Sequence, residues 1–249
     1  MADATLALLL RTGAFVPQSI AELPNIVMWE RADGDKTLVV DKVSRLGELA
    51  FTAEESLQGD NDKRPTFTAD FGDTLPAIRF DGVDDMLETA ENVTVLDTFV
   101  EWNLILNNDG AKTITVSAHT GMFNLHLNSS KLRIHVNRPD GVSTKEQIST
   151  GSALTDGSWA LLRTEYRGTH DRHLAFLNGV ALPMDTFGPD DGDPTGSKAA
   201  HMALGSTVAA QFFADVWFRE RLLVSPAPPQ SEALMVDEEM ALRWGVTLP

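Results

Sequence analysis

The sequence predicts an all-β protein that folds as an antiparallel β-sandwich, with a short helix near each end of the chain. Short β-type runs alternate with turn signals from residue 75 to residue 219. The clearest runs place an apolar side chain at every second position, which is the pattern of a strand with one face in a core. The chain lacks the strand–helix alternation of a parallel α/β sheet, and this favours a sandwich.

Composition excludes several classes of protein. The chain has 249 residues, of which 36 are acidic and 20 are basic, so the formal net charge is −16. Such a charge disfavours binding to nucleic acid and to anionic membrane surfaces, since both depend on Lys and Arg. The absence of cysteine removes disulfides, a thiolate nucleophile and cysteine-type zinc sites. Hydrophobic residues make up 43% of the chain, which is enough for a full core.

Residues 1–23 form an extension with one short apolar run. The run is preceded by Asp3, is interrupted by Arg11 and is too short for a secretory signal or a membrane span. One interpretation is a short helix that packs on its own domain. The alternative is a docking helix that buries four leucines against another protein: Leu6, Leu8, Leu9 and Leu10.

The sequence predicts a series of short strands separated by turns. Two of them, around the turn at residues 128–130, should pair as a hairpin because their apolar residues alternate in step. Asn178-Gly179 is a second hairpin signal, since both residues tolerate positive φ. Residues 187–198 read as a long acidic loop. The expected strands are 75–80, 98–106, 112–118, 122–128, 131–137, 159–167, 173–178, 201–205 and 212–219.

A helix is expected at the C-terminal end, over residues 230–243. Ser231 is placed to cap it, with Glu232 in the first turn and Arg243 in the last, as the helix dipole prefers.

Several motifs along the chain resemble those of a known family. A tryptophan near the start (Trp29), Arg64-Pro65 before a loop, and then the run Phe80-Asp81-Gly82-Val83-Asp84-Asp85-Met86-Leu87 follow in order. Later come the hairpin at Leu177-Asn178-Gly179, the strand Phe212–Phe218 and the tail Arg243-Trp244-Gly245-Val246. This order resembles the laminin-G-like, concanavalin A-like lectin/glucanase jelly rolls that occur in many phage virion proteins. The resemblance covers residues 24–249 and implies one jelly-roll domain that includes the C-terminal helix.

The Asp81–Asp85 motif has a physical explanation. Asp81-Gly82 makes a tight turn after a core strand, and the following aspartates can accept backbone N–H bonds. A turn that fixes two strands is the main interpretation, and calcium coordination is the alternative.

Candidate ligand-binding residues are aromatic and acidic. In residues 212–219, alternation places Trp217 on the face opposite Val216 and Phe218, beside Asp215 and Arg219. This arrangement is typical of a sugar platform, although burial under the C-terminal helix is the alternative for the same tryptophan. Trp102 is a second candidate. Among the acidic runs of the sequence, the oxygen-rich loop with Asp190, Asp191 and Asp193 is the best candidate for a calcium site.

No catalytic signature is found. Hydrolases of this fold carry two carboxylates on one strand, and no expected strand here does. A nucleophile elbow and a phosphate loop are also missing. The expected function is therefore a non-enzymatic structural protein of a phage virion, in a capsid decoration, spike or tail fibre. It would assemble in the host cytoplasm as a homo-oligomer and contact other virion proteins. The alternative is a carbohydrate-binding adhesion module that contacts a host surface glycan, and glycoside hydrolysis comes third.

Overall fold

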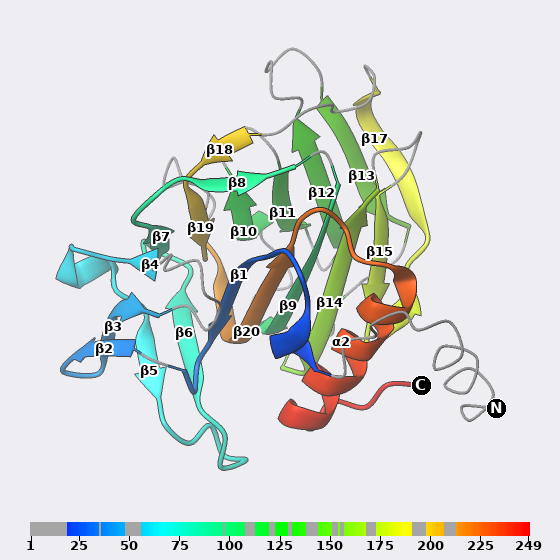
Figure 1. The fold of residues 1–249 in the computed structure, drawn as a ribbon. Coiled ribbons are helices and arrows are strands. Elements are labelled where there is room, and N and C mark those ends of the chain that lie inside the picture. The colour runs from blue at the N-terminus through cyan, green and yellow to red at the C-terminus, as the bar shows by residue number, and fades with distance from the viewer. Residues whose placement is uncertain are drawn as a thin grey trace.

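A computed structural model shows an antiparallel jelly-roll β-sandwich with one α-helix packed on its outside (Figure 1). The predicted fold class is confirmed. The structure describes residues 19–34, 36–47, 56–96, 98–107, 113–119, 123–128, 131–137, 144–150, 154, 157–167, 173–190, 198–206 and 213–249. The apolar run with Leu6, Leu8, Leu9 and Leu10 lies outside these residues, and the only helical turn described before residue 26 is η1 (Ile20–Glu22).

One layer, called here the helix-side sheet, lies beneath the C-terminal helix. Its central strand is β20, which pairs with β9 on one side and with both β1 and β6 on the other. Beyond β9 follow β14, β15 and β16. The bounds are β1 Ile26–Arg31, β6 Ala77–Asp81, β9 Phe99–Asn107, β14 Trp159–Tyr166, β15 Leu174–Leu177, β16 Val180–Ala181 and β20 Asp215–Val224.

The second layer, the far sheet, runs in the order β7, β19, β10, β11, β12, β13 and β17. The predicted pairing of β11 with β12 is confirmed, with Leu125 opposite Ile134. The bounds are β7 Leu87–Thr89, β10 Thr113–His119, β11 Phe123–Asn128, β12 Lys131–Asn137, β13 Thr144–Ser149, β17 Met184–Asp190 and β19 Met202–Leu204.

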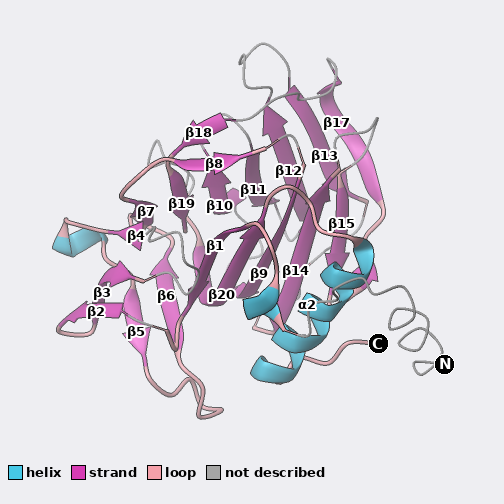
Figure 2. Ribbon diagram, viewed as in Figure 1, coloured by secondary structure: helices cyan, strands magenta, loops and turns pink. Residues whose placement is uncertain are grey.

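Short strands connect the two layers at one edge (Figure 2), so that the strands of both layers belong to one continuous folded sheet, whereas β8 and β18 pair with each other as a separate two-stranded sheet. Strand β3 pairs with β2, β4 and β5, while β4 reaches β7 and β5 reaches β6. The remaining elements are β2 Lys36–Val39, β3 Lys42–Leu46, β4 Ser56–Leu57, η2 Asn61–Lys63, β5 Thr66–Thr68, β8 Val93–Val95 and β18 Lys198–Ala200. In the described part of the chain, no helix is both long enough and apolar enough to cross a membrane.

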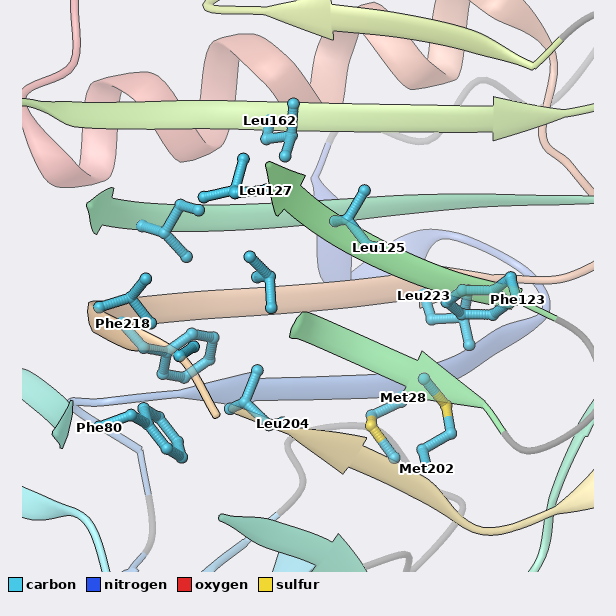
Figure 3. Packing of buried hydrophobic residues seen from close by; sticks show 14 of the residues in the cluster. Met28, Phe80, Phe123, Leu125, Leu127, Leu162, Met202, Leu204, Phe218 and Leu223 are labelled. Carbon is cyan, nitrogen blue, oxygen red and sulfur yellow. The ribbon is translucent and has the colours of Figure 1, made fainter. Parts of the chain in front are cut away.

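The main core lies between the two sheets. Phe80 and Phe218 come from the helix-side sheet, and Leu125, Leu127 and Leu204 meet them from the far sheet (Figure 3). These side chains are buried because strand alternation turns every second residue inward, as the sequence pattern predicts.

A second core lies on the other face of the helix-side sheet, under α2 (Gln230–Trp244). The helix ends at Trp244 and is followed by Gly245, whose φ of 69° is the left-handed conformation typical of a C-terminal cap. The expectation that Ser231 caps the start is wrong, because the helix begins at Gln230 with Pro229 at the cap position. Glu232 and Arg243 do lie in the first and last turns.

The second core buries Trp29, Trp102, Leu222, Val236 and Trp244, among others.

Buried carboxylates attach α2 to the sheet. Glu220 on β20 accepts hydrogen bonds from Trp29 Nε1 at 2.7 Å, from Arg243 Nη1 at 2.6 Å and from Trp244 Nε1. Asp237 on α2 accepts from Trp102 Nε1 at 2.9 Å.

Asp237 also forms an ion pair with Arg163 of β14, at 2.7 Å, and both side chains are almost completely buried. Burial raises the pKa of Asp237 to about 6, against the opposing effects of the Arg163 charge and the Trp102 hydrogen bond. The helix is therefore held by polar contacts as well as by apolar packing.

Candidate functional site

A row of side chains crosses the outer face of the helix-side sheet beside α2. Trp217 on β20 lies opposite Arg79 on β6 and opposite Leu106 on β9, and Leu106 lies opposite Trp159 on β14. Directly paired residues point to the same face of a sheet, so these four side chains share one surface. Both tryptophans are partly exposed, whereas Leu106 is buried between them.

The loop between β5 and β6 places a third ring over this row. The ring centroid of Phe71 lies 4.4 Å from that of Trp217 and 5.6 Å from that of Trp159, with an edge-on angle of 81° to Trp159. The loop is fixed by its own hydrogen bonds: Phe71 N donates to Leu75 O, and Asp70 Oδ1 accepts from two loop N–H groups. We call Phe71, Trp159 and Trp217 the aromatic platform.

A cation and a carboxylate border the platform on the Trp217 side. The Arg79 guanidinium lies 5.6 Å from the Trp217 ring centroid and 3.5 Å from Asp215 Oδ1. The Arg79 side chain is 43% exposed and the Asp215 side chain is 24% exposed. Both groups can therefore reach a ligand that rests on the indole of Trp217.

On the Trp159 side the neighbouring charges are held more tightly. The Arg219 guanidinium is fully buried, stacks 3.9 Å from the Trp159 centroid and binds both carboxylate oxygens of Asp73, at 2.7 and 2.6 Å. Desolvation opposes ionisation of Asp73, but hydrogen bonds from Arg219 and Leu75 N outweigh it and lower the pKa of Asp73. This ion pair holds the loop, and with it Phe71, against the sheet.

The two predicted tryptophans occupy different environments. Trp217 faces out of the main core beside Asp215, as alternation predicts, and it contacts Phe71 and Arg79. Trp102 is fully buried under α2, where its Nε1 donates to Asp237. Trp102 therefore offers no surface to a ligand, because the helix that covers β9 closes this face.

The predicted calcium loop is only partly described. Asp190 is the last residue of β17 and pairs with Lys145 of β13, so the strand extends into the segment predicted as a loop. Asp191 and Asp193 lie outside the described residues.

The Asp81–Asp85 turn brings three carboxylates together at the end of β6. One oxygen each from Asp81, Asp84 and Asp85 lies within 4.8 Å of the others. Burial, followed by the charge of Asp81, raises the pKa of Asp85 to about 7, and the charge of Lys42 acts in the opposite direction. Gly82 has a φ of 77°, which confirms the predicted tight turn.

A groove of about 400 Å³ on the small connecting strands was not predicted. Arg64 lines one wall, but its guanidinium donates to the carbonyl oxygens of Gln58 and Gly59 and to Asn61 Oδ1. The guanidinium of Arg64 therefore stabilises the wall of the groove itself. The aromatic platform is the stronger candidate for a ligand-binding site.

The chain has structural neighbours among solved proteins but no match among protein families. No protein-family model matches the chain, and no curated protein does either. Among solved structures, the botulinum neurotoxin serotype D binding domain matches with a TM-score of 0.60 and 12% identity, over 88% of this chain and 53% of that one. The serotype G binding domain matches with a TM-score of 0.61 and 9% identity, over 87% of this chain and 51% of that one.

A third structure is the serotype D ligand binding domain in complex with N-acetylneuraminic acid, with a TM-score of 0.58, 12% identity, and coverage of 88% of this chain and 52% of that one. The chain thus spans about half the length of these neighbours. At this level of identity, the comparisons establish that the chain shares the lectin-like β-sandwich fold of these binding domains.

Proposed function

We propose that the domain is a non-enzymatic carbohydrate-binding module and that the aromatic platform is its binding surface. The observation that carries this proposal is the row of partly exposed rings, Trp217, Phe71 and Trp159, with Arg79 and Asp215 at its edge. The apolar C–H face of a sugar ring packs on an aromatic ring, and its hydroxyl groups need charged or polar partners beside that ring. The platform supplies both.

Two observations support binding over catalysis. The carboxylates nearest the platform, Asp73 and Asp215, are each paired with an arginine, at 2.6 and 3.5 Å. Glycoside hydrolysis needs one carboxyl group as an acid and another as a nucleophile or base across the scissile bond. The structural neighbours are described as binding domains, and one of them holds N-acetylneuraminic acid, which supports a glycan as the ligand.

Changing Trp217 to Ala is expected to weaken glycan binding by about tenfold or more, since a lost ring contact of about 1.5 kcal/mol corresponds to this factor. Trp217→Phe should keep part of the affinity because a smaller ring remains. The measurement is a glycan array with the wild-type domain, followed by calorimetric titration of its best glycan into each variant.

The matched control is Leu242→Ala, which removes a side chain that is 86% exposed on α2 and distant in sequence from the platform strands. This variant should bind like the wild type. The proposal fails if no glycan binds to the wild-type domain, or if Trp217→Ala binds its glycan with unchanged affinity.

For the biological setting, we propose attachment of this module to a phage particle. The order of sequence motifs resembles virion-associated jelly rolls, and the leucine-rich run at residues 6–10 supports docking. The full chain is expected to co-sediment with purified particles, and a variant with Leu6, Leu8, Leu9 and Leu10 changed to Ser is expected to remain in the supernatant. Equal sedimentation of both proteins would contradict docking by this run, and absence of the protein from particles would contradict the setting.

A further inference from the structure

The turn between β6 and β7 gathers carboxylates in a way that the glycan proposal does not use. Asp81, Asp84 and Asp85 each contribute an oxygen to a group whose members lie within 4.8 Å of one another. All three come from one five-residue segment, so the turn itself sets their separation.

Backbone hydrogen bonds account for part of this arrangement. Asp81 Oδ1 accepts from Val83 N at 2.9 Å, and Asp85 Oδ2 accepts from Asp81 N at 3.0 Å. The second oxygen of Asp85, Oδ1, is different: the side chain is 1% exposed, and this oxygen has no hydrogen-bond donor in the described structure.

A buried carboxylate oxygen without a partner is energetically costly, typically by about 1–3 kcal/mol or more for a charged group. The neighbours of Asp85 increase the cost, because one oxygen each of Asp81 and Asp84 lies within 4.8 Å of an oxygen of the Asp85 carboxyl group. Lys42 supplies one positive charge near Asp85 against the three carboxyl groups of the turn. A cation bound among these oxygens would satisfy Asp85 Oδ1 and offset the repulsion.

Contacts on two sides fix the shape of the turn. Gly82 has a positive φ, and a Cβ at this position would lie 2.9 Å from Asp215 Cβ, so the turn packs tightly against the start of β20. On the other side, Met86 N donates to Lys63 O at 3.1 Å. The carboxylates therefore do not need to be gathered when a cation arrives, which lowers the entropic cost of binding.

From the three carboxylates and the orphaned buried oxygen of Asp85, we propose that the Asp81–Asp85 turn is a calcium site. Calcium takes six to eight oxygen ligands in flexible geometry, whereas magnesium requires a near-ideal octahedron. The turn supplies three carboxylates, and backbone carbonyl oxygens or water would complete the calcium shell.

Calorimetric titration of Ca²⁺ into the chelator-treated full chain tests the proposal. The wild type is expected to bind one ion with a Kd of about 10⁻³ M or tighter, the range of modest calcium sites. Asp85→Asn and Asp84→Asn should each weaken binding by about tenfold or more, since each removes a charged ligand. Asp84 is the more exposed position, so its variant tests the site with little risk to folding.

Asp62→Asn is the matched control, because Asp62 is an exposed aspartate of η2 outside the carboxylate group. It should bind Ca²⁺ like the wild type. Circular dichroism in EDTA should show the same folded spectrum for all variants, so that lost binding does not reflect lost folding. The proposal is overturned if the wild type shows no calcium binding, or if Asp84→Asn and Asp85→Asn both bind as tightly as Asp62→Asn.

Discussion

Replacing Glu220 with Ala is expected to lower the free energy of unfolding by about 3–5 kcal/mol, the cost of breaking a buried charged contact from one side. Glu220 is fully buried and accepts hydrogen bonds from β1 through Trp29 and from α2 through Arg243 and Trp244. The change leaves the indole N–H groups of Trp29 and Trp244 without this acceptor and removes one of the two carboxylate partners of Arg243, which keeps Glu239. Urea unfolding followed by tryptophan fluorescence measures the loss as a lower midpoint.

Two further variants make this result specific. Glu220→Gln keeps the shape and one acceptor oxygen, so it should lose less than Glu220→Ala. Glu238→Ala, at an exposed position on α2, should change the free energy of unfolding by no more than about 0.5 kcal/mol. A loss below about 1 kcal/mol for Glu220→Ala would show that α2 does not depend on this carboxylate.

Gly205→Ala is expected to destabilise the fold by about 2–5 kcal/mol, from positive-φ strain together with overpacking. Gly205 follows β19 with a φ of 82°, and a Cβ there would lie 2.1 Å from Phe80 Cδ1. Phe80 is fully buried in the main core, so its ring has little room to move. Thermal and urea unfolding should both show the loss.

The matched control separates strain from overlap. Gly157 also has a positive φ, of 75°, but among the described residues, its chain neighbours aside, no atom lies within 4 Å of its Cβ position. Gly157→Ala should therefore cost only about 1–2 kcal/mol. In the Gly205→Ala background, Phe80→Leu should cost less than it does alone, because it relieves the overlap. Equal losses at the two glycines would show that the contact with Phe80 has no effect.

Local sequence patterns predicted much of the sandwich. Alternation correctly separated Val216 and Phe218, which are buried in the main core, from Trp217 on the outer face. The Asn178-Gly179 turn forms as expected, with φ of 49° and 81°, because few other residue pairs tolerate this conformation. These features depend on residues that are neighbours along the chain, so a sequence reveals them.

Features that depend on distant residues were not predicted. Periodicity assigns Trp102 to a face of β9, but it does not reveal that α2, from residues 230–244, covers this face. Phe71 was not singled out either, because it lies in a loop without periodicity. It joins Trp217 and Trp159 only when β6, β9, β14 and β20 pair. A signal was present in Asp70 and Asp73, whose side chains fix the loop.

The central place of β20 has a consequence for synthesis of the protein in a cell. Strands β1, β6 and β9 all pair with residues 215–224, which a ribosome produces last among these four strands. Until then, the earlier apolar strands lack their central partner, and such exposed edges favour aggregation. Folding therefore depends on contacts between distant parts of the sequence, which makes it slow. We expect the nascent chain to need chaperone protection, and recombinant yield to improve when translation is slowed by lower temperature.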